Sequence, residues 1–90
     1  MKPGVAARVA AARCVAAVLS GSTLDATLEE QLRSLEERDR GLARELASGT
    51  LRLVPRLDAL LTQLLDRPLR RRNVELRALA LIGLYQLSRM

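Results

Sequence analysis

The sequence predicts an all-α domain, and its composition and its periodicity both support this class. Alanine, leucine, arginine and glutamate dominate, whereas the β-branched and aromatic residues that favour strands are scarce. Apolar residues recur at the three- and four-residue spacing of amphipathic helices. With 90 residues, the chain has room for one domain, able to bury roughly 60–65% of its unfolded surface. We therefore treat residues 1–90 as a single helical domain.

Residues 38–65 organise the predicted fold. Pro55 lies away from the apolar stripe of this segment, removes a backbone donor and crowds the carbonyl four residues earlier. The sequence therefore predicts a bend or a break near residues 51–54, with the stripe facing one core on both sides of it. The stripe consists of Leu42, Leu46, Gly49, Leu53, Leu57, Leu60 and Leu64. A second apolar side consists of Leu51, Val54, Leu61 and Leu65.

Two single residues in this segment carry further expectations. Asp39 is the expected N-cap, accepting hydrogen bonds from the first turn of the helix. Gly49 lies on the apolar stripe in mid-helix, where glycine costs up to ~1 kcal/mol relative to alanine. The close approach of another backbone would compensate for this cost, and a hinge or a ligand contact is the alternative.

Two helices are expected before this segment. The first covers residues 5–20, and Gly21 is a natural stop after it. The second runs to about residue 35 and begins at a capping box. In this motif the hydroxyl of Ser22 and the carboxylate of Asp25, three residues on, each accept a hydrogen bond from a free backbone N–H. This second helix is acidic, so we expect it to face away from a phosphate backbone. The apolar stripes are Val5, Val9, Ala12, Ala16 and Leu19 in the first helix, and Leu24, Leu28, Leu32 and Leu35 in the second.

The last helix is expected over residues 74–89. The sequence Asp66-Arg67-Pro68 ends the preceding helix, and Asn73 is the expected cap. The last helix is apolar nearly all round and should be buried nearly all round. Either it self-associates or further helices of a longer domain cover it, and we favour the second reading. One face has Leu76, Leu79, Ala80, Gly83, Leu84 and Leu87, while Leu81, Ile82 and Tyr85 occupy the others.

Charge points to a polyanionic partner. The formal net charge is +5 and the pI is about 11.0, which suits nucleic acid or an anionic surface. A coding bias toward arginine, and arginines that are merely solvated, are the alternative explanations. With 1% aromatic residues, base stacking cannot be the main mode of binding, which leaves contacts to phosphates. Arg8 and Arg13 flank the apolar stripe of the first helix on opposite edges, so we expect two separated charges there rather than one dense basic face. The candidate contact residues are Lys2, Arg8, Arg13, Arg70, Arg71 and Arg72.

Several classes of function are excluded by what the sequence lacks. Cys14 is the only cysteine and there is no histidine, so we expect no internal disulfide, zinc site or His-dependent catalysis. Cys14 lies among alanines and is interpreted as a small packing residue. No apolar run approaches the length of a membrane span, and arginines interrupt the N-terminal segment where a signal peptide would be apolar. The expected location is the cytoplasm.

Three runs carry a family resemblance: RDRGLARELASGTLR, LDALLTQLLDRPLR and LIGLYQL. Together they resemble the NusB-like N-terminal domain of the RsmB/Sun/Fmu family, bacterial methyltransferases of cytosine C5 in small-subunit rRNA. The resemblance covers about residues 8–87, with Ile82 where a second leucine is common. The antitermination factor NusB shares the fold, but its last helix reads closer to LYEL and its first helix has a denser arginine cluster than Arg8 and Arg13 provide.

The resemblance implies a NusB-like helical bundle, truncated at its C-terminal end relative to the family. Such a domain contacts RNA and holds it for a separate Rossmann-like domain, which binds S-adenosylmethionine and attacks the pyrimidine with cysteines. This chain has no glycine-rich cofactor loop and no Pro-Cys signature, so we expect no catalysis and no cofactor in these 90 residues. The expected partners are small-subunit rRNA and the missing methyltransferase domain. The alternatives are a stand-alone antitermination factor or a protein-interaction module.

Overall fold

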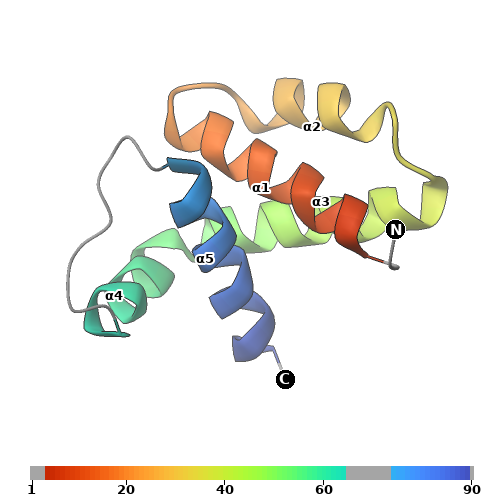
Figure 1. Ribbon diagram of the computed structural model, residues 1–90. Coiled ribbons are helices and arrows are strands. Elements are labelled where there is room, and N and C mark those ends of the chain that lie inside the picture. The colour runs from red at the N-terminus through yellow and green to blue at the C-terminus, as the bar shows by residue number, and fades with distance from the viewer. Residues whose placement is uncertain (1–3, 65–73, 90) are drawn as a thin grey trace.

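The computed structural model describes residues 4–64 and 74–89, which form helices and no strand (Figure 1). The predicted all-α class is confirmed. Helix α1 lies between α2, α3 and α5, and α3 contacts each of the other four helices. The central place that we expected for residues 38–65 is therefore shared between α1 and α3. The helices are α1 (Val5–Leu19), α2 (Leu24–Leu32), α3 (Glu37–Arg52), α4 (Val54–Leu64) and α5 (Val74–Ser88).

The predicted interruption at the proline is confirmed as a break. α3 ends at Arg52, and Leu53 leaves helical geometry with φ −106° and ψ 11°. α4 begins one residue later, so Pro55 falls in its first turn, where a missing backbone N–H breaks no helical hydrogen bond. The amide of Leu57 donates to the carbonyl of Leu53 at 2.9 Å, which joins the two helices end to end.

The break changes which leucines reach the core. Leu46 and Leu57 are buried as predicted, but Leu60 and Leu64 are 41% and 68% exposed. Our expectation that the stripe keeps its phase past the proline is wrong at these two positions. α4 instead turns Leu57 and Leu61, four residues apart, toward the core.

The buried face of α1 differs from the predicted one. Val5 and Val9 are 38% and 39% exposed, and the buried residues are mostly alanines. Small side chains allow α3 and α5 to approach this helix closely, and Val5 and Val9 lie on its outer side. Gly21 follows the helix with φ +114°, so its predicted role as a stop is confirmed. The buried residues of α1 are Ala7, Ala10, Ala11, Ala12, Cys14, Val15 and Ala16.

The caps of α2 and α3 also differ from the prediction. Thr23, rather than Ser22, caps α2, and its hydroxyl accepts from the amide of Ala26 at 3.3 Å. The residue at the N-cap of α3 is Glu36, with extended backbone and no side-chain cap bond, so Asp39 lies inside the first turn. α2 ends at Leu32 rather than near residue 35, and residues 33–36 form a tight connection to α3.

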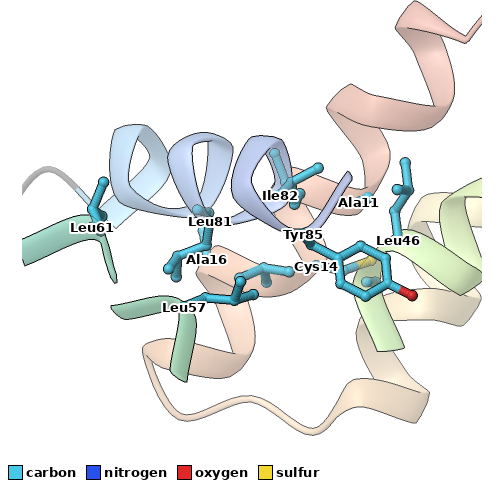
Figure 2. Packing of buried hydrophobic residues seen from close by; sticks show 13 residues of the cluster. Ala11, Cys14, Ala16, Leu46, Leu57, Leu61, Leu81, Ile82 and Tyr85 are labelled. Atoms are coloured by element: carbon cyan, nitrogen blue, oxygen red, sulfur yellow. The ribbon is translucent and has the colours of Figure 1, made fainter. Parts of the chain in front are cut away.

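The core lies where α5 crosses α1, α3 and α4 (Figure 2). Leu81, Ile82 and Tyr85 of α5 are at most 2% exposed. The Tyr85 ring covers Gly49 of α3, and a Cβ at Gly49 would meet the ring, with Cε1 at 2.7 Å. The packing explanation of Gly49 is thus confirmed, although the close neighbour is a ring and not a backbone.

The outer side of α5 is open. Leu76, Leu79 and Leu87 are 53%, 50% and 64% exposed. The cover that we expected for this helix, from a second copy or from further helices, is therefore not supplied by the described residues. The described part of the chain supplies neighbours for only one side of this helix. The predictions for Leu65, for residues 66–68 and for Asn73 concern positions outside the described residues.

Candidate nucleic-acid interface

Two of the six predicted contact residues can be placed in the structure, Arg8 and Arg13 on α1. Both side chains are exposed and point about 140° apart around the helix, given 100° per residue. They therefore form two separated charges, as predicted, and not one dense basic face. The remaining candidates, Lys2, Arg70, Arg71 and Arg72, lie outside the described residues.

The two arginines lie toward opposite ends of α5. The Arg8 Nε donates to Gln86 Oε1 at 3.3 Å, near the end of α5. With the amide oriented so that its oxygen faces the guanidinium, Nη2 also donates to it at 3.0 Å. Arg13 lines a shallow pocket of about 290 Å³ together with Gln31 and Glu75, near the start of α5. Both remain accessible to a ligand at the surface.

A larger basic feature lies between α2 and α3, where we did not expect one. A groove of about 710 Å³ is lined by Arg33, Arg40 and Arg44, with Asp25 and Glu29 toward its other side. Its apolar floor consists of Leu24, Leu28 and Leu32. We had assigned this region to the acidic part of the molecule. The four-residue spacing of Arg40 and Arg44, which puts both on one side of α3, was the sequence signal for it.

Other arginines serve the fold. Arg77 of α5 forms a two-point ion pair with Asp58 of α4, with Nη2–Oδ2 at 2.9 Å and Nε–Oδ1 at 3.2 Å. Arg89 lies 3.6 Å from Glu45 and 5.7 Å from the centre of the Tyr85 ring. These contacts join α5 to α4 and α3, so neither arginine is a first choice for ligand binding.

The single cysteine is buried, and the described residues contain no cluster of metal-binding side chains. The Cys14 side chain is fully buried, and this burial raises the pKa of its thiol, with a hydrogen bond to Thr27 opposing the shift and Glu30 adding to it. A buried thiol with a raised pKa is a poor nucleophile. Within residues 4–64 and 74–89, no group of acids and cysteine is placed to hold a metal ion. Among the described helices, none has the length and apolar character that a membrane crossing requires.

Fold and surface together define a small helical domain with exposed arginines on several of its helices. Comparison with known proteins agrees, because the model of the NusB family matches residues 5–90. The chain belongs to the NusB family. The family resemblance carried by the three sequence runs is thereby confirmed.

The relatives are ribosomal RNA small subunit methyltransferases B. The protein of Pseudomonas putida is 53% identical over 81 residues, which are 89% of this chain and 19% of the relative. The protein of Pseudomonas syringae pv. tomato is 51% identical over 89% of this chain and 18% of the relative. The protein of Sodalis glossinidius is 43% identical over 98% of this chain and 21% of the relative. The chain thus spans about a fifth of the length of these relatives. No solved structure matches it significantly.

Proposed function

We propose that this chain is the RNA-binding domain of an rRNA cytosine-C5 methyltransferase. It would position small-subunit rRNA through contacts of arginine and lysine with phosphates, for a catalytic domain outside the chain. The observation that carries the proposal is the 53% identity to part of a ribosomal RNA small subunit methyltransferase B. The net charge of +5 supports a polyanionic ligand. The proposed place of action is the cytoplasm.

Recognition through phosphates is favoured by the position of the one aromatic residue. Tyr85 is the sole aromatic side chain, and it is 2% exposed in the core. Base stacking on a ring, which most single-strand binders use, has no surface residue to rely on. Binding should therefore be tolerant of sequence and steeply dependent on salt.

The methyl donor, S-adenosylmethionine, belongs to the catalytic domain in this proposal. The described residues do not fit it, because they form a helical bundle whose groove between α2 and α3 is lined by charged side chains and leucines. The glycines at 41, 49 and 83 lie inside helices and build no phosphate-cradling loop. This chain alone is therefore proposed to bind RNA without transferring a methyl group.

RNA titration over a salt series tests the proposal. Wild-type protein and the triple variant Arg70→Ala, Arg71→Ala, Arg72→Ala would be titrated with a fragment of small-subunit rRNA. Each lost phosphate contact should lower the slope of log K against log salt by roughly 0.7–0.9. Arg38→Ala is a control, since Arg38 lies 3.6 Å from Glu36 on the surface. An unchanged slope in the triple variant removes residues 70–72 from the interface, and no RNA affinity in the wild type refutes the function.

A second candidate is a protein-interaction module, which includes a stand-alone antitermination factor. The exposed leucines of α5, Leu76, Leu79 and Leu87, favour it, because exposed apolar surface often marks a contact with a partner. Light scattering on the isolated chain, combined with the RNA titration, separates the two functions. Self-association without RNA affinity would support the interaction module.

A further inference from the structure

The groove between α2 and α3 has its positive charge concentrated at one end. The two helices run in opposite directions and are joined by residues 33–36 (Figure 1). Arg33 lies in this connection, Arg40 lies in the first turn after it, and Arg44 follows one helical turn later. Asp25 lies in the first turn of α2, away from the connection, and Glu29 lies one helical turn before Arg33. A ligand near the connection therefore meets Arg33 and Arg40, with Arg44 one turn further along the same groove.

Arg40 is held in place before any ligand arrives. Its Nε donates to two backbone carbonyls at the end of α2, that of Leu32 at 3.1 Å and that of Leu35 at 2.9 Å. The side chain is nevertheless exposed, and a guanidinium has four more N–H donors on its two Nη atoms. A fixed arginine loses less conformational entropy on binding an anion than a mobile one.

Arg33, Arg40 and Arg44 differ from several other surface arginines because no acidic side chain among the described residues forms an ion pair with them. Among residues 4–64 and 74–89, acidic partners within 4 Å are found for Arg38, Arg77 and Arg89, and for none of the three groove arginines. Asp25 and Glu29 line the same groove without an ion pair to them. The positive charge of the groove is thus not neutralised by close contact within the described part of the protein.

We propose that the connection end of this groove, with Arg33, Arg40 and Arg44, binds a phosphate group of RNA. The proposal rests on the proposed RNA-binding function and assigns it a surface on α2 and α3. Arginine forks match the geometry of phosphate oxygens and bind them through charge-assisted hydrogen bonds. An acidic peptide lying along the whole groove would meet both Asp25 and Glu29, whereas one phosphate near the connection stays away from Asp25 in the first turn of α2. The acids then limit the RNA contact to that end.

The test compares two double variants of equal charge in a salt-dependent titration with a short RNA stem-loop. Arg33→Ala with Arg44→Ala removes two proposed contacts and leaves the Arg40 bonds to α2 intact. Arg38→Ala with Arg89→Ala removes the same charge elsewhere. We expect the groove variant to lower the slope of log K against log salt by roughly 1.4–1.8, at about 0.7–0.9 per contact, and the control to change it by less than half as much. Thermal unfolding checks that both variants are folded.

The possible outcomes lead to different conclusions. Equal slopes for the two double variants, with RNA still bound by the wild type, overturn the groove proposal alone. Absence of RNA binding in the wild type overturns the proposed function and this proposal with it. Poly-glutamate serves as a second probe. If the groove variant loses affinity for poly-glutamate but not for RNA, the groove binds acidic peptides and the proposal is wrong. Asp25→Asn with Glu29→Gln should tighten RNA binding, and a weakening would contradict the assignment.

Discussion

Replacement of Gly49 by alanine should destabilise the protein, although alanine is the better helix former. A Cβ at Gly49 would overlap the Tyr85 ring, whose Cε1 would lie at 2.7 Å. The ring is 2% exposed and enclosed by the core, so it cannot swing away. Overpacking of this kind costs about 1–3 kcal/mol, and this severe overlap suggests the upper end. A gain of about 1 kcal/mol in helix propensity offsets part of it, which leaves a net loss of about 2 kcal/mol.

The assay is thermal or urea unfolding followed by far-UV circular dichroism. A loss of this size lowers Tm by roughly 8–16 °C for a domain of this length. Gly41→Ala is the matched control, because Gly41 lies in the same helix and a Cβ there meets nothing within 4 Å. It should stabilise by about 0.5–1 kcal/mol. Combining Gly49→Ala with Tyr85→Leu should cost less than the sum of the single changes. If Gly49→Ala is as stable as Gly41→Ala, the close contact does not exist.

Three further predictions concern the interior and the contact between α4 and α5. The Thr50 hydroxyl is fully buried and finds no hydrogen-bond partner among the described residues, so Thr50→Val should stabilise by about 1 kcal/mol in urea unfolding, and a loss of stability would show that the hydroxyl is bonded. Arg77→Met should lower the free energy of unfolding by about 1 kcal/mol, because it removes the ion pair with Asp58. A double-mutant cycle with Asp58→Asn should give a coupling energy near 0.5–1 kcal/mol, and zero coupling would mean that the ion pair does not contribute to stability. The raised pKa of Cys14 means that the native state holds the thiol proton more tightly than the unfolded chain does. The contribution of this thiol to the free energy of unfolding is therefore complete below the ordinary pKa of 9.0 and is lost as pH rises through the higher native pKa. Cys14→Ala should therefore flatten the loss of stability above that pH, and identical pH profiles for the two proteins would contradict the shift.

Features that follow from the chemistry of a single residue were predicted correctly from the sequence. Pro55 interrupts the helical run because it lacks a backbone donor, and Gly21 follows α1 with positive φ because it lacks a Cβ. Gly49 was predicted to lie at a close contact because a mid-helix glycine has a cost that packing must compensate. The N-cap of α2 could not be chosen from the sequence, because Ser22 and Thr23 are both good N-caps. Only the hydrogen bond that Thr23 accepts from the amide of Ala26 decides between them.

The candidate site could be predicted only in part. Arg8 and Arg13 were correctly expected to be separate charges, because their angular spacing on one helix follows from the sequence alone. The groove arginines were not expected, because Arg33 follows the end of α2 while Arg40 and Arg44 belong to α3, and only the packing of these helices brings them to one groove.

By itself the sequence determined the all-α class, an interruption of the helix near Pro55, the scarcity of aromatic rings and the family resemblance. These follow from composition, from the chemistry of single residues and from short runs of sequence. Only the tertiary structure decided which side of α1 is buried and which neighbour fills the space beside Gly49. The reason is physical, because both α1 and α5 have apolar residues around much of their circumference, so periodicity leaves several faces equivalent. The choice between them depends on helices far away in the chain, which press against the alanines of α1 and leave Val5 and Val9 outside.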